Sequence, residues 1–157
     1  NSDNATPAHY DLIYLRAGTD NIITAWIPIG DVSIEEGGLM YLEGSHLEGV
    51  KLEKEFSIKN ADLSREEQIN AFNKNMTDGG WISKDFPDLA NKFNSQWLVA
   101  NYEAGDVLLH SPYLIHASTN NGSQESRIRL STDIRFQNVN DKIDTRWSNH
   151  WHEDDNL

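Results

Sequence analysis

AHYDLIYL, at residues 8–15, is the stretch from which both the fold and the site are inferred. Its apolar and aromatic side chains predict a strand, and alternate side chains of a strand share one face. His9 and Asp11 are therefore expected to point the same way, one imidazole beside one carboxylate. Such a pair supplies two of the three protein ligands of a metal site.

A third ligand has to come from another part of the fold. Two histidines and one carboxylate on one face of an octahedral ferrous ion leave positions open for substrate and oxygen. The candidate is His116, which ends the apolar run of residues 113–116. A His-x-Asp triplet alone is a weak signal, because it arises by chance and is more often a surface pair. The apolar setting of His9 and Asp11, and the second apolar strand carrying His116, favour metal binding.

Composition limits the class of protein. The 157 residues are 38% hydrophobic, which fits one globular domain with its own core. A net charge of −12 disfavours nucleic acid and anionic membrane surfaces as partners. Cysteine is absent, so any metal must be held by His, Asp or Glu. The sequence has no apolar run of the roughly 20 residues needed to span a bilayer, and no signal-peptide pattern, so a soluble, cytoplasmic protein is expected.

Short β-rich runs alternate with turn signals along most of the chain. The first two are expected to form a hairpin across the turn at residues 17–21, and the second should end at Pro28, which has no N–H for a ladder. Several short strands separated by turns predict a β-sandwich or jelly roll. The expected strands are residues 8–15, 22–29, 39–42, 97–100, 107–110, 113–116 and 127–136.

Residues 47–94 have a different character, with charges and amides in place of β-branched runs. The capping-box pattern at residues 64–67, followed by Ile69, Phe72 and Met76 at helical spacing, predicts a helix over residues 63–75. A shorter helical piece is expected over residues 87–93. The region is interpreted as an insertion, helical around residues 60–94, where substrate specificity or a lid could reside.

Taken in order, these segments resemble the phytanoyl-CoA dioxygenase family. The resemblance rests on His9-x-Asp11, TAWIP at 24–28, GGLMYLEGSH at 37–46, GDV at 105–107 and His116-Ala-Ser. The resemblance covers nearly the whole chain, and the residues of these segments are most similar to those of uncharacterised fungal and microbial members. The family consists of non-haem Fe(II), 2-oxoglutarate-dependent oxygenases, so the resemblance implies a mainly β, double-stranded β-helix (jelly-roll, cupin-like) fold. Residues 1–157 are then expected to be the C-terminal portion of a single oxygenase domain that lacks its N-terminal part.

The same resemblance implies roles for individual residues. His9, Asp11 and His116 match the three iron ligands. Arg127 matches the arginine that binds the distal carboxylate of 2-oxoglutarate, a task suited to a planar guanidinium. Arg129 is expected to share a strand face with Arg127 and begins an Arg-x-Ser motif found in related oxygenases. Both arginines therefore stay candidates, and the spacing from His116 favours Arg127.

Two further residues are expected near the cosubstrate. Trp26 falls where the family places a tryptophan, although core packing explains it equally well, and Thr24 could offer a hydroxyl. The other histidines are expected to be structural or solvated instead of ligands: His46, His110, His150 and His152.

The resemblance implies an Fe(II)- and 2-oxoglutarate-dependent dioxygenase that hydroxylates a small organic molecule and releases succinate and CO2. Retention of Asp11 favours a hydroxylase, because related halogenases lose this carboxylate to make room for halide. Two alternatives stay open from the residues: a cupin-like metalloenzyme that uses no 2-oxoglutarate, and a catalytically degenerate β-sandwich binding module. The sequence leaves the primary substrate and the oligomeric state open.

Overall fold

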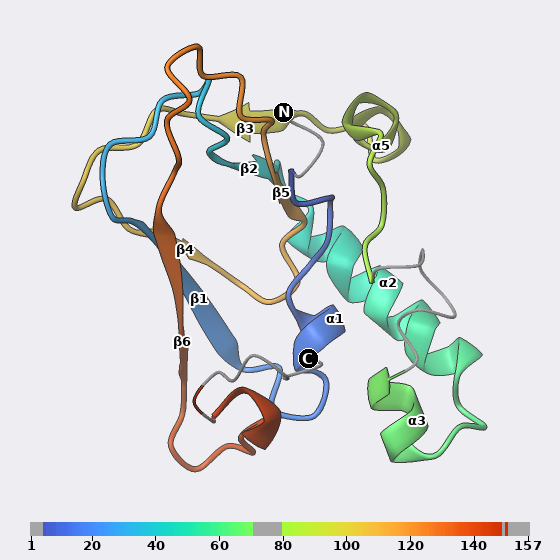
Figure 1. The fold of residues 1–157 in the computed structure, drawn as a ribbon. Coiled ribbons are helices and arrows are strands. Elements are labelled where there is room, and N and C mark those ends of the chain that lie inside the picture. Colours follow the sequence, from blue (N-terminus) through green and yellow to red (C-terminus); the bar gives the residue numbers. More distant parts are fainter. Residues whose placement is uncertain (1–4, 71–79, 149, 151–157) are drawn as a thin grey trace.

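The computed structural model describes residues 5–70, 80–148 and 150. Its strands form two small antiparallel sheets (Figure 1). In the first sheet, β1 (Ile22–Pro28) is the central strand, between β4 (Leu108–His110) and β6 (Ser131–Gln137). As predicted, β1 ends at Pro28, which pairs with Ser131 of β6.

The second sheet is built around β2 (Leu39–Leu42). It lies between β3 (Trp97–Val99) and β5 (His116–Ser118), and both pairings are antiparallel. Two such sheets agree with a jelly-roll arrangement, but over the described residues they do not close into a complete barrel. The mainly β, antiparallel class predicted from the sequence is confirmed at that level.

The register of the first sheet decides which side chains share its inner face. Thr24 pairs with His110 on one side and with Arg135 on the other, while Trp26 pairs with Asp133. Paired residues of an antiparallel sheet point to the same face. All five therefore share one face of the sheet, and all except Thr24 line the cavity described below.

Helices occupy the opposite side of Figure 1 from the first sheet. They are α1 (Leu12–Leu15), α2 (His46–Lys59), α3 (Arg65–Asn70) and α5 (Phe86–Lys92). A 3-10 turn at Thr145–Trp147 lies instead near the lower end of β6 (Figure 1). The side chain of Asp85 accepts a hydrogen bond from the N–H of Asp88 and so caps α5, which confirms the predicted short helix. Within the described residues, no helix is long and apolar enough to cross a membrane.

A buried charged pair ties α1 to α2. Arg16 donates to the two carboxylate oxygens of Glu53 at 2.7 and 2.8 Å, and its guanidinium lies 3.6 Å from the ring centre of Phe56. The hydroxyl of Tyr10, fully buried, donates to the same carboxylate at 2.8 Å. These contacts fix the segment that carries the first predicted ligands.

The predicted strand over residues 8–15, and its hairpin with the next run, are wrong. Ala8 and His9 form only isolated bridges, and the chain turns at Asp11 into α1. The stretch is buried on all sides, and an apolar run without strict alternation fits a buried helical turn as well as a strand. The partners of β1 are the distant strands β4 and β6.

The sequence reading also missed α2. Only Gly49 and Phe56 of its 14 residues are buried, so no apolar stripe of helical period marks it. Helix α3 covers residues 65–70 of the predicted helix 63–75, and residues 71–75 lie outside the described part. Strand β5 begins at His116, where the predicted strand 113–116 ended, and β6 begins four residues after the predicted start at 127.

Candidate metal centre

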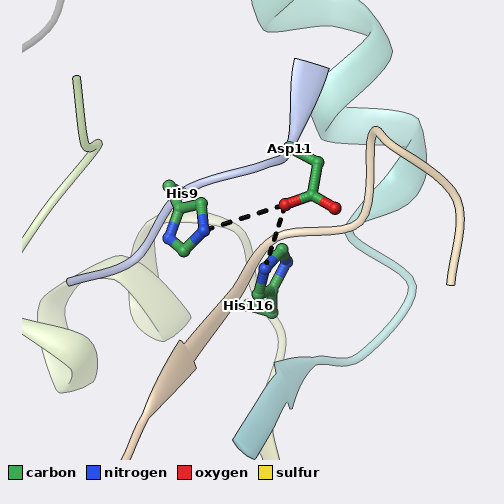
Figure 2. A group of neighbouring side chains, drawn as sticks. All are labelled: His9, Asp11 and His116. Atoms are coloured by element: carbon green, nitrogen blue, oxygen red, sulfur yellow. Dashed lines mark ion pairs between the residues drawn. The ribbon is translucent and has the colours of Figure 1, made fainter. Parts of the chain in front are cut away.

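The side chains of His9, Asp11 and His116 converge on one point (Figure 2). Asp11 Oδ1 lies 3.9 Å from His9 Nε2 and 3.5 Å from His116 Nε2, and one ligand atom from each of the three residues lies within 4.8 Å of the others. Ligand atoms about 2.1 Å from one octahedral ion lie about 3 Å apart, so a small adjustment seats an ion. The predicted triad is brought together.

Backbone pairing explains why the two imidazoles meet. His9 N–H donates to His116 O at 3.0 Å, and His116 N–H donates to His9 O at 2.9 Å, which closes a two-residue antiparallel bridge. Directly opposed residues point to the same face, so the rings lie 4.3 Å apart between centres. The bridge replaces the strand expected at residues 8–15 and still delivers His9 to the site.

The other ring nitrogens show that both Nε2 atoms are available as ligands. His9 Nδ1 lies 2.8 Å from the carbonyl of Pro7, and His116 Nδ1 lies 2.9 Å from the carbonyl of Leu114. A carbonyl only accepts, so each Nδ1 carries the proton and each Nε2 keeps a lone pair toward Asp11. Metal-binding histidines commonly have this arrangement. The residues present therefore fit a divalent metal ion.

Electrostatics keep the three groups in the protonation states that ligation needs. Burial would raise the pKa of Asp11, but the His110 N–H, the electrostatic interaction with the neighbouring His116 ring and the Thr24 hydroxyl hold that pKa well below its ordinary range. Burial lowers the pKa of His116 to about 3 and also lowers the pKa of His9. At neutral pH the site thus holds one carboxylate and two neutral imidazoles.

The second oxygen of Asp11 is held by other side chains. Thr24 Oγ1 donates to Oδ2 at 2.6 Å, His110 Nε2 lies 3.4 Å from it, and a guanidinium nitrogen of Arg135 lies 3.8 Å away. The Thr24 hydroxyl, expected near the cosubstrate, thus lies on the carboxylate of Asp11. Oδ1 is left facing the two imidazoles.

The triad opens onto a cavity of about 530 Å³ between the two sheets. Trp26, Leu39 and Ala117 line part of it, together with the polar side chains of Arg129 and Asp133. The guanidinium of Arg129 lies 5.7 Å from the ring centre of Trp26 and donates to Ser131 at 3.2 Å. Burial lowers the pKa of Arg129.

Arg127 occupies a different place from Arg129. Its Nε lies 2.9 Å from a carboxylate oxygen of Glu36, and it lines a neighbouring cavity of about 420 Å³. The two cavities share Ser118 and Arg129. Because β6 starts only at Ser131, the face shared by the two arginines in a long predicted strand does not exist.

Among the other histidines, His110 was underestimated from the sequence. It lies in the sheet wall as expected, but its ring faces Asp11 and its centre is 4.7 Å from that of His116. His110 faces Asp11 because β4 pairs with β1 and sets His110 opposite Thr24. No local sequence pattern predicts this pairing. His46 and His150 are exposed, away from the triad cavity, and His152 lies outside the described residues.

A family model described as phytanoyl-CoA dioxygenase (PhyH) matches residues 1–129. Two curated relatives are named 1-deoxypentalenic acid 11-beta-hydroxylase. The protein from Streptomyces arenae is 29% identical over 133 residues, and the one from Streptomyces exfoliatus is 30% identical over 133. Each alignment covers 84% of this chain and 41% of the relative, so the chain spans about two fifths of their length.

Two solved structures have a similar fold. One is the epimerase SnoN in complex with Fe3+, alpha ketoglutarate and nogalamycin RO, with a TM-score of 0.53 and 20% identity over 85% of this chain and 42% of that one. The other is the non-heme alpha ketoglutarate dependent carbocyclase SnoK from nogalamycin biosynthesis, with a TM-score of 0.51 and 23% identity over 83% of this chain and 42% of that one. At these identities the likeness concerns the fold.

Proposed function

The chain belongs to the phytanoyl-CoA dioxygenase family, as its ordered motifs predicted, and from that membership we propose a non-haem Fe(II)- and 2-oxoglutarate-dependent dioxygenase. The proposed reaction is hydroxylation of a small organic molecule with release of succinate and CO2. The observation that carries the proposal is the convergence of His9 Nε2, Asp11 Oδ1 and His116 Nε2, each with its other polar atom already engaged.

The three ligands would hold the metal from one side and leave the positions facing the cavity open. When bound, the Fe(II) and 2-oxoglutarate together supply the activation of oxygen and the oxidation of a C–H bond. The chain supplies geometry: the His9–His116 bridge orients the imidazoles, and Thr24 orients the carboxylate. Apolar side chains such as Leu39 and Trp26 limit access of water to one side of the cavity.

We assign Arg129 as the anchor of the distal carboxylate of 2-oxoglutarate. It lines the triad cavity and is half-buried, whereas Arg127 lines the neighbouring cavity and is paired with Glu36. A guanidinium that is partly withdrawn from water binds a carboxylate more strongly than one that is exposed and already paired. Arg127, favoured by spacing, is kept as the matched comparison.

The substrate is proposed to be a small organic molecule, because the hydroxylase and carbocyclase names of the similar proteins refer to such compounds. Residues 1–157 are proposed to be the C-terminal portion of one double-stranded β-helix domain. The support is that the similar structures match 83–85% of this chain over about two fifths of their own length.

Anaerobic titration with Fe(II) and 2-oxoglutarate tests the function directly. A weak visible charge-transfer band that needs both components is expected. A metal-only response would favour the cupin-like metalloenzyme, and no response at all would favour a binding module.

Site variants then test the assignments. Asp11→Ala or His116→Ala should abolish Fe(II) binding and succinate formation, and normal turnover in either would overturn the proposal. Arg129→Ala should raise the 2-oxoglutarate requirement by about a hundredfold, the loss of roughly 3 kcal/mol of charge-assisted bonding, while Arg127→Ala changes it little.

A further inference from the structure

His110 carries a buried polar atom that the triad does not explain. Its side chain is 2% exposed, and in the described part of the chain its Nε2 is a buried side-chain atom without a hydrogen-bond partner of ordinary geometry. Buried polar atoms of native proteins are usually satisfied, so such an atom calls for a reason. The nearest charged atom is Asp11 Oδ2, at 3.4 Å.

The contacts on the far side of the ring decide which nitrogen carries the proton. His110 Nδ1 lies 2.9 Å from the hydroxyl of Tyr41. A carboxylate at Asp11 only accepts, so a neutral imidazole facing it places its proton on Nε2 and leaves Nδ1 as an acceptor. Tyr41 then donates its O–H to Nδ1. Tyr41 thus donates to His110, and His110 directs its N–H toward the accepting carboxylate of Asp11.

This order gives the two oxygens of Asp11 different tasks. Thr24 donates to Oδ2 at 2.6 Å, and His110 directs its N–H to the same oxygen. Oδ1 alone faces His9 and His116. A carboxylate without these restraints turns about its Cβ–Cγ bond and can bind a cation through both oxygens, which occupies a further coordination position.

We propose that His110, oriented by Tyr41, is a positioning residue that keeps Asp11 a one-oxygen ligand and so keeps a coordination position open for the cosubstrate. The inference rests on the proposed metal and cosubstrate. It predicts unequal effects on two affinities. Loss of the His110 N–H weakens binding of 2-oxoglutarate to the metal-loaded protein more than it weakens binding of the metal. Unspecific damage to the site would weaken both together.

The test compares His110→Leu, which removes the donor, with His110→Gln, which keeps an N–H of similar reach. Mn(II) affinity of the purified protein is measured first, by the loss of the free-ion signal in electron paramagnetic resonance. Binding of 2-oxoglutarate to the Fe(II)-loaded protein is then measured anaerobically through the charge-transfer band. His46→Leu is the matched control, because His46 is an exposed histidine outside the site.

In His110→Leu, the dissociation constant for 2-oxoglutarate should rise about tenfold or more, in line with the effect of losing an outer partner of a ligand. Mn(II) affinity should fall by less than this, because Thr24 and Arg135 still contact Oδ2 of Asp11. His110→Gln should recover most of the loss, and Tyr41→Phe, which keeps the imidazole but frees its tautomer, should show an intermediate loss.

Wild-type affinity for 2-oxoglutarate in His110→Leu would overturn the inference, and so would equal losses in the leucine and glutamine variants. If His110→Leu does not fold, Tyr41→Phe decides between the same outcomes. Failure of the wild type to bind metal would instead overturn the proposed function, so the two failures are distinguishable.

Discussion

Replacing Thr24 by valine removes one hydroxyl and little else. The hydroxyl donates to Asp11 Oδ2 at 2.6 Å, and Thr24 and Asp11 are only 1% and 4% exposed. Valine has nearly the same shape as threonine, so the packing against the sheet is kept. The change therefore isolates one hydrogen bond between a buried donor and a buried carboxylate.

The expected cost follows from the charge of the acceptor. A hydrogen bond to an ionised group contributes about 1.5–3 kcal/mol, and losing the donor leaves the carboxylate partly unsatisfied. For a chain of this size each kcal/mol lowers the melting temperature by about 2–4 °C, so Thr24→Val should melt about 3–12 °C below the wild type. Metal affinity should fall about tenfold, because an outer partner of a ligand is lost.

Calorimetry of the metal-free protein and a Mn(II) titration measure the two effects. Thr24→Ser keeps the donor and is the control; it should stay within about 1 kcal/mol of the wild type, the cost of one lost methyl group. If Thr24→Val melts together with the wild type and binds Mn(II) with the same affinity, the carboxylate is not held by this hydroxyl, and the account of the site is wrong.

Acidification should destabilise the metal-free protein below pH 6.5. In the unfolded chain His116 has a pKa near 6.5, whereas burial in the folded protein lowers its pKa to about 3. The free energy of unfolding should therefore fall by about 2 kcal/mol from this residue between pH 7 and pH 5. Urea denaturation at the two pH values measures the change, and a flat profile would contradict the burial of His116. Gly49→Ala should destabilise by about 1–3 kcal/mol, because an added Cβ would lie 1.9 Å from the carbonyl oxygen of Tyr113. Gly30→Ala, where the Cβ would meet open space, is the control for thermal melting, and equal effects of the two changes would refute the close approach of α2.

Local sequence patterns were sufficient to predict several parts of the structure. The spacing of His9 and Asp11, and the identity of His116 as their partner, followed from ligand chemistry and an ordered set of motifs. Strands such as β1 and β2 followed from β-branched and apolar runs bounded by turns, and the short helix predicted over residues 87–93 is found as α5. These features depend on residues near one another in the chain, where side-chain period and capping act.

Other parts depended on contacts between distant segments. Residues 8–15 are buried almost throughout and show no strict alternation, so only the bridge from His9 to His116 and the packing of α1 on α2 decide that they are not a strand. The apolar stripe of helix α2 is weak, because only Gly49 and Phe56 are fully buried and Leu52 is partly buried against the core. Neither feature has a local signature.

The sequence by itself determined the chemistry of this protein, which is two imidazoles and a carboxylate in a β-rich family with a recognisable order of motifs. The tertiary structure alone decided which arginine reaches the cavity, and that His110 turns an N–H toward Asp11. The physical reason is that ligand identity is a property of single residues, whereas access and orientation depend on which strands pair and where β6 begins.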